Sequence, residues 1–197
     1  MNKSIDYEAL SSLKNILLTF QITMEKLLSM FLYRKGSIPE IEKALSNINN
    51  QINSELLRTP SYDKKKVNQF IEIYQRIGYI NESFMSIVLA IQAKNDEKVL
   101  FSDKAVKEIE TLFQNLISML KNIVDYLGTR NSILLNHLIE DQARYEASCQ
   151  HFSNEHEDRL AKGICLPRSS TIYLKISDKM CNISWDLISV VNIIGKL

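Results

Sequence analysis

The chain has 197 residues, of which 45% are hydrophobic and 24% are charged. This balance is typical of a folded globular protein and argues against a disordered chain. The formal net charge is +1, which gives no indication of the basic surface that nucleic-acid binding uses, so no nucleic-acid partner is predicted. Glycine (5) and proline (3) are scarce, and this favours long helices with few loops over a turn-rich sheet.

Apolar residues recur at alternating steps of three and four along the first half of the chain. The stretches cover residues 10–31, 38–52 and 67–91. Such spacing places the apolar side chains along one side of a helix. Gly36 is expected to end the first helix, and Ser37 can cap the second. We therefore predict three long helices before residue 95.

A polar segment separates the second stretch from the third. Thr59-Pro60-Ser61 is expected to break the second helix, because proline disfavours helical geometry in the residue before it. Lys64-Lys65-Lys66 is the chain's basic run. We interpret it as the solvated first turn of the third helix rather than as a contact with phosphates of a nucleic acid.

Three further apolar stretches follow, at residues 106–127, 135–156 and 173–194. Ser102 precedes the first of them and is expected to act as its N-cap. Gly128 is expected to stop that helix, and the next is expected to end near Gly163. The second half of the chain is thus predicted to contain three helices as well.

The two halves show weak similarity in corresponding places, as an old internal duplication would leave. The matching segments are Tyr33-Arg34-Lys35-Gly36-Ser37 with Tyr126-Leu127-Gly128-Thr129-Arg130, and Arg76-Ile77-Gly78 with Lys175-Ile176-Ser177. The polar segment at residues 94–98 is the predicted boundary between them. We predict an all-α protein of six long helices in two tandem three-helix bundles, residues 1–94 and 95–197.

Cysteine usage and apolar run length bear on the cellular location. Cys149, Cys165 and Cys181 are an odd number without a Cys-x-x-Cys pair, which disfavours a disulfide framework and indicates a reducing compartment. No apolar run approaches the roughly 18 residues that cross a bilayer. We therefore predict a chain without a membrane span of its own.

The C-terminal part of the chain carries a family resemblance. The segments are Glu155-His156-Glu157-Asp158-Arg159-Leu160-Ala161-Lys162-Gly163, Lys175-Ile176-Ser177-Asp178 and Asn182-Ile183. They resemble the second repeat of a PhoU-like domain, and more specifically the cytoplasmic C-terminal domain of bacterial sodium/phosphate cotransporters. In that family a His-x-x-Arg-Leu motif ends one helix, and His156 and Arg159 match it. Asp178 and Asn182 match the motif on the following helix.

The resemblance implies a function as well as a fold. It implies two three-helix repeats and a non-enzymatic role in sensing or gating phosphate uptake. The implied partner is a membrane transporter domain or the phosphate-uptake machinery, met from the cytoplasmic side of the bacterial plasma membrane. Long helices with broad apolar sides also make a homodimer plausible.

Some members of this family bind metal clusters through carboxylates, so the ligand positions decide whether a metal is expected here. The matching positions read Gln75, Tyr79, Leu174 and Asp178, and the fifth predicted helix offers Gln142 and Glu146. A neutral amide, a phenol and an alkyl chain cannot supply the charge that a cluster of hard cations requires. No metal and no other cofactor is therefore predicted, with Asp178 and Glu146 as residual family positions. The alternative is a metal-binding sensor or metal-dependent enzyme that uses Asp178, Asn182 and Glu146.

Individual polar residues allow a purely structural interpretation and a functional one. Asp178 and Asn182 lie one helical turn apart and form either a surface hydrogen bond or the remnant of a ligand site. Arg159 is expected to close the end of its helix against the helix dipole rather than to bind phosphate.

The residues on the apolar stripes are interpreted as packing residues. His156 and Cys149 share a stripe, but two ligands do not make a closed zinc site. His156 is therefore expected to be a packed or boundary residue with its polar nitrogen bonded to a backbone carbonyl. Asn81 and Gln142 interrupt apolar stripes and are expected to fix helix register through paired amides. Trp185 is expected to be in the core, or on a contact surface if the chain dimerises.

Overall fold

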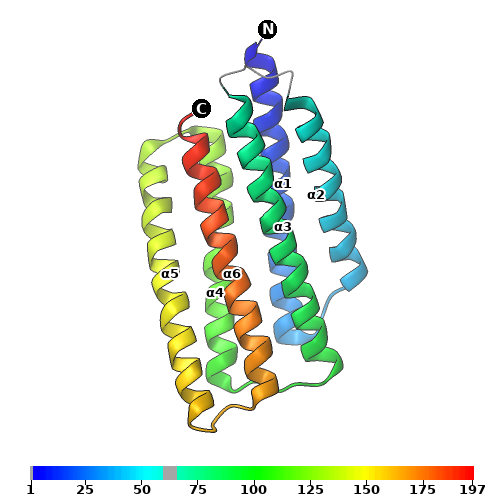
Figure 1. Ribbon diagram of the computed structural model, residues 1–197, viewed down its shortest axis with the longest axis vertical. Helices are drawn as coiled ribbons and strands as arrows, with labels where there is room; N and C mark the ends of the chain where they lie inside the picture. Colours follow the sequence, from blue (N-terminus) through cyan, green and yellow to red (C-terminus); the bar gives the residue numbers. More distant parts are fainter. Residues whose placement is uncertain (1, 60–65) are drawn as a thin grey trace.

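The computed structural model describes residues 2–59 and 66–197, and within these ranges it contains six α-helices and no strand (Figure 1). The helices are α1 (Asn2–Tyr33), α2 (Ile38–Arg58), α3 (Val67–Asp96), α4 (Asp103–Thr129), α5 (Ser132–Ala161) and α6 (Pro167–Ile194). The prediction of an all-α chain with six long helices is confirmed. Pro60, Ser61, Lys64 and Lys65 lie outside the described residues, so the predicted helix break and most of the basic run do as well.

The helix ends follow the local sequence with one exception. Ser102 caps α4 as expected, because its hydroxyl accepts a hydrogen bond of 3.3 Å from the backbone N–H of Ala105. Ser37 occupies the N-cap position of α2, but its side chain accepts no capping hydrogen bond within the described ranges. The end expected at Gly128 is met to within one residue: α4 ends at Thr129, and the next residue, Arg130, adopts a left-handed φ of 54°.

The predicted polar linker begins later than expected. Helix α3 includes the first residues of the expected linker and ends at Asp96. Lys94, which was expected in the linker, is packed rather than solvated. The Lys94 side chain is 8% exposed, and its ammonium donates to the carbonyl oxygen of Phe31 at 3.1 Å. That bond satisfies one of the open carbonyls in the last turn of α1.

The helices pack as a central group of four with one helix on either side. Helix α3 packs against α6 and α1 against α4, while α2 and α5 lie at opposite edges of the bundle (Figure 1). Helix α2 contacts α3 and α1, and α5 contacts α6 and α4. The core contains large, fully buried side chains from all four central helices: Phe20, Phe31, Phe70, Tyr74, Phe84, Phe113 and Tyr173. The rings of Phe20 and Phe84 stack at 4.7 Å and join α1 to α3.

One described stretch, Glu8–Tyr33 in α1, is long and apolar enough to cross a membrane by length and composition alone. The buried core helix of a bundle meets the same criteria, and Leu13, Leu17 and Phe20 of this stretch are buried against the other helices. The predicted lack of a membrane span therefore stays a prediction.

A disulfide joins α5 to α6. Cys149 and Cys181 are bonded, with their Cα atoms 6.4 Å apart, and Cys165 is unpaired within the described ranges. The expectation that the cysteines form no disulfide is wrong. The two residues are 32 positions apart in sequence, and only the antiparallel packing of α5 on α6 brings them to facing positions. The cysteine argument for a reducing compartment thereby loses its premise.

Candidate functional site

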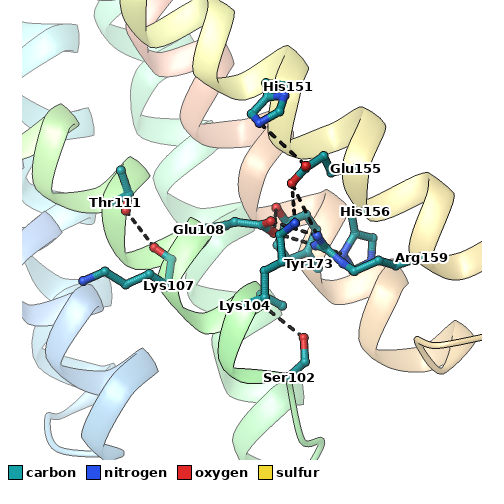
Figure 2. A network of polar contacts seen from close by, with 11 residues as sticks. Ser102, Lys104, Lys107, Glu108, Thr111, His151, Glu155, His156, Arg159 and Tyr173 are labelled. Atoms are coloured by element: carbon teal, nitrogen blue, oxygen red, sulfur yellow. Dashed lines mark hydrogen bonds and ion pairs between the residues drawn. The ribbon is translucent and has the colours of Figure 1, made fainter.

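The two residues that match the family's His-x-x-Arg motif belong to a buried polar network between α4, α5 and α6 (Figure 2). The guanidinium of Arg159 on α5 donates to both carboxylate oxygens of Glu108 on α4, at 2.9 and 2.6 Å. The Arg159 and Glu108 side chains are 11% and 5% exposed. Bidentate geometry of this kind is the strongest form of the arginine–carboxylate pair. Arg159 lies in the last turn of α5, as expected, but its guanidinium reaches across to Glu108 of α4.

A tyrosine from α6 completes the coordination of the carboxylate. The hydroxyl of Tyr173 donates to Oε2 of Glu108 at 2.8 Å, and this side chain is fully buried. The ring of His156 lies flat on the Tyr173 ring, with a centroid separation of 3.9 Å and an angle of 7° between the planes. Burial, and then the hydrogen bond to Glu108, raise the pKa of Tyr173. The phenol is therefore a proton donor at neutral pH.

The geometry defines the protonation state of His156. Its Nδ1 lies 3.2 Å from Nη2 of Arg159, and a guanidinium can only donate. Nδ1 must therefore accept, and the imidazole is neutral with its proton on Nε2. Burial, and then the charge of Arg159, lower the pKa of His156, while Glu108 acts in the opposite direction. The prediction of a packed histidine is confirmed, but the expected bond to a backbone carbonyl is wrong: Nδ1 lies against Arg159 and Nε2 has no partner in the described part of the chain.

An outer layer of charges connects this network to solvent. Lys104 on α4 pairs with Glu155 on α5 at 2.6 Å, and Figure 2 shows Glu155 lying above Arg159. Glu155 is also 3.9 Å from Arg159 and 3.8 Å from His151. The hydrogen bond from Lys104 is the main reason that the pKa of Glu155 lies below its ordinary value. Charges of opposite sign thus alternate from the surface to the buried Glu108.

Sequence reasoning missed Glu108 and Tyr173 as members of this network. A signal for Glu108 was present, since it shares the buried face of α4 with Ala105, Ile109 and Leu112. A carboxylate on the buried face of a helix must have a partner, because burying an unpaired charge is costly. The identity of the partner depends on which helix lies opposite, and the local sequence does not contain that information.

The remaining family-matched residues are not brought together. Asp178 and Asn182 are exposed on α6 and Glu146 is exposed on α5, and no described hydrogen bond or ion pair links any two of them. Partial burial is the main reason that the pKa of Asp178 is raised, with Glu157 adding to it. Within the described ranges no three His, Cys, Asp or Glu side chains are placed to hold a metal ion. The prediction that no metal binds stays a prediction.

The positions where the family would place further ligands are likewise dispersed. Gln75 and Tyr79 are exposed on α3, and Leu174 is half-buried on α6. Tyr79 instead lines a shallow groove of about 430 Å³ between α3 and α6, together with Asn182 and Trp185. Trp185 is 50% exposed, so its expected place in the core is wrong and its role on a contact surface stays a prediction.

The two buried amides behave differently. The amide of Asn81 donates to the carbonyl oxygen of Leu45 at 3.2 Å and to Oδ1 of Asn49 at 2.9 Å, which joins α3 to α2. The expected pairing is confirmed there. Gln142 on α5 is 7% exposed, and its Nε2 has no partner in the described ranges.

Taken as chemistry, the network has the character of a structural connection. The carboxylate of Glu108 is occupied by three hydrogen bonds and neutralised by Arg159, which leaves it poorly placed to take a proton from a substrate.

Comparisons of the chain with family models, with curated proteins and with solved structures found no significant match.

Proposed function

We propose that this chain is a non-enzymatic, PhoU-like interaction domain that regulates phosphate transport from the cytoplasmic side of a bacterial membrane. On this proposal its six helices are two copies of one three-helix unit, residues 1–94 and 95–197. The partner is the membrane part of a sodium/phosphate cotransporter or another component of phosphate uptake. A repeated hydrogen bond carries the two-unit part of the proposal, and the motif resemblance carries the phosphate part.

The repeated hydrogen bond joins the third helix of each half to the first. The hydroxyl of Tyr74 on α3 donates to the carbonyl oxygen of Ala9 on α1 across 65 residues. The hydroxyl of Tyr173 on α6 donates to the carboxylate of Glu108 on α4, also across 65 residues. Both tyrosines are fully buried. An equal spacing at equivalent helices is what a duplication predicts.

An arginine–glutamate pair also joins the first and second helices of each half, with the glutamate shifted by one position: Glu8 precedes Ala9, whereas Glu108 itself accepts the tyrosine hydrogen bond. Arg58 at the end of α2 pairs with Glu8 on α1 at 2.6 Å, across 50 residues. Arg159 near the end of α5 pairs with Glu108 on α4 at 2.6 Å, across 51 residues. The outer helices also make matched contacts, since α2 packs on α3 and α1 as α5 packs on α6 and α4. These correspondences support two copies of one unit.

A helical bundle alone does not define a function, so the phosphate assignment depends on the residues. His156 and Arg159 match the family motif, and their positions in a buried network are consistent with a structural motif rather than a catalytic one. The cytoplasmic location rests on the resemblance alone, because the cysteines no longer support it. Regulation by contact requires that the domain bind two conformations of its partner with different affinity.

Phosphate uptake in the native host tests this proposal. The gene is disrupted, and uptake of radiolabelled phosphate is followed at low and at high external phosphate, with the wild-type gene restored as the control. We expect the dependence of uptake on external phosphate to change on disruption and to return on restoration. Uptake that is identical in all three strains at both concentrations would reject a role in phosphate transport.

The second candidate is a metal-binding sensor or metal-dependent enzyme, and one observation favours keeping it. Burial raises the pKa of Asp178, and the nearby carboxylate of Glu157 adds to the rise, so two carboxylates lie near one another, and carboxylate oxygens are the ligands that hard cations prefer. Elemental analysis of protein purified without chelator separates the candidates. Near-stoichiometric zinc, iron or manganese that disappears in Asp178→Ala would favour the metal-binding function over the proposed one.

A further inference from the structure

Helix α5 differs from its counterpart α2 in what it buries. The buried residues of α2 are Ile41, Leu45, Ile48, Ile52 and Glu55. The buried residues of α5 are Leu138, Gln142, Tyr145, Cys149 and His156. Apolar burial is the dominant force that holds a helix on a bundle, and α5 has one aliphatic residue where α2 has four. Helix α5 therefore depends on other interactions to stay in place.

The polar atoms that α5 buries are poorly satisfied. Buried side-chain atoms without a hydrogen-bond partner in the described ranges include Gln142 Nε2, Tyr145 Oη, His156 Nε2 and Arg159 Nε, all on α5. The others are on Asn81, Asn95 and Ser170. An unpaired buried polar group favours any state in which water reaches it. These atoms thus favour an open α5 over a docked one.

Two connections oppose that opening, and they lie at different points along the helix. The network of Glu108, Arg159 and Tyr173 holds the C-terminal end of α5 (Figure 2). The covalent bond between Cys149 and Cys181 holds the middle of α5 to α6. Between Ser132 and Cys149 the fully buried residues of the helix are Leu138, Gln142 and Tyr145. Leu134 and Leu135 are half-buried against the core.

We propose that the Cys149–Cys181 pair is a reversible redox site, and that its reduction releases the N-terminal part of α5, residues 132–149, from α4 and α6. The polar network keeps the C-terminal end attached in both states. This inference does not depend on a role in phosphate transport. It is compatible with a cytoplasmic domain, since disulfides of cytosolic proteins are usually transient and redox-sensing.

The chemistry requires a dithiol as the co-reactant. One thiolate of the dithiol attacks a sulfur of the pair, the Cys149–Cys181 bond breaks, and a mixed disulfide forms. The second thiol of the reductant then displaces the protein sulfur. The net transfer is two electrons and two protons to the protein, which leaves two thiols, while the dithiol becomes a disulfide. Cys181 is partly exposed and Cys149 is buried, so the attack is expected on the sulfur of Cys181.

Hydrogen–deuterium exchange of the full chain, oxidised or reduced with dithiothreitol, tests the proposal. We expect exchange protection in residues 132–148 to fall at least about tenfold on reduction, because the disulfide limits local opening. Residues 38–58 of α2 are the internal control and should change less than about twofold. Intact-mass analysis should show that reduction adds the mass of two hydrogens.

Two variants make the outcome decisive. The double variant Cys149→Ser with Cys181→Ser should exchange like the reduced wild type in both redox conditions. Cys165→Ser keeps the pair and should behave like the wild type. Equal protection of residues 132–148 in the oxidised and reduced chain would overturn the proposal. A loss of protection in α2 as large as that in residues 132–148 would also overturn it, as would a loss in all six helices of the double variant. The proposal would fail as well if reduction of the oxidised chain did not add the mass of two hydrogens.

Discussion

The two halves of the molecule contain the same ion pair in two different environments. The Arg58 and Glu8 side chains are 47% and 55% exposed, whereas those of Arg159 and Glu108 are 11% and 5% exposed. Both pairs have an oxygen–nitrogen distance of 2.6 Å. Distance alone therefore says little about what each pair contributes.

The buried tyrosine of each half makes a different contact. In the first half, Tyr74 donates to a backbone carbonyl, and the ion pair remains at the surface. In the second half, Tyr173 donates to the carboxylate of the pair itself, and His156 covers it. An exposed pair is screened by water and contributes little. A buried pair is expensive to desolvate and much more expensive to break.

The largest effect is expected when the buried pair loses its carboxylate. Glu108→Gln leaves the buried Arg159 charged, with only the more distant Glu155 at 3.9 Å as a counter-charge, and breaking a buried pair costs about 3–5 kcal/mol. Glu8→Gln is the matched change in the first half and is expected to cost less than about 1 kcal/mol. Urea denaturation followed by circular dichroism measures both. Equal losses for the two variants would show that the halves do not differ as their exposures indicate.

The tyrosines provide a second comparison with a smaller effect. Tyr173→Phe removes a donor from a buried carboxylate, and hydrogen bonds to charged groups contribute about 1.5–3 kcal/mol. Tyr74→Phe removes a bond to the neutral carbonyl of Ala9, for which about 0.5–1.5 kcal/mol is expected. The free energy of unfolding of each variant, relative to the wild type, decides the order. A larger loss for Tyr74→Phe would contradict it.

The pH dependence of stability tests the neutral state of His156. Its pKa in the folded protein is lowered, mainly by burial, while that of the unfolded chain is about 6.5. The unfolded state therefore binds more protons in this range, and the contribution is complete above about pH 6.5 and is lost as the pH falls below it. Denaturation midpoints between pH 7.5 and 5 should fall less steeply for His156→Gln than for the wild type.

His151→Gln is the control for this effect, since His151 is exposed. It should follow the wild-type profile over the same pH range. If His156→Gln and the wild type fall in parallel, the imidazole does not change its proton occupancy on unfolding.

The sequence was sufficient for the helices and insufficient for the contacts between them. Apolar periodicity is a local property, so the stripes at residues 10–31 and 106–127 could be assigned to helices directly. The caps were also local, and Ser102 behaves as expected. The stop expected at Gly128 is met to within one residue, since α4 ends at Thr129.

Only part of the site could be predicted, because its contacts join helices that are distant in the sequence. The motif indicated His156 and Arg159, but Glu108 lies 51 residues from Arg159 and 65 residues from Tyr173 in the sequence, so the local sequence did not identify it as their partner. The Cys149–Cys181 bond was missed because an odd count and the lack of a local pair say nothing about which helices become neighbours. Trp185 was expected in the core, or on a contact surface if the chain dimerises, because Ile183 and Leu187 lie nearby on the same helix. Both neighbours are buried, but Trp185 is half exposed.

The smallest expected effect concerns the position at which the two halves differ on the exposed side of their third helices, Asp178 on α6 and Tyr79 on α3. Asp178 has a raised pKa because partial burial and Glu157 disfavour its charged form. Replacing it by a neutral isostere should therefore stabilise the fold at pH 7, by no more than about 0.5 kcal/mol for so exposed a residue. Because the folded pKa is the higher one, the gain of Asp178→Asn should vanish as the pH falls below both pKa values and the wild-type carboxyl becomes neutral in either state. Thermal unfolding at pH 7 and at pH 3 measures this. A destabilised variant at pH 7 would mean that the charge has a favourable partner, such as a bound cation, and would favour the metal-binding function over regulation by contact.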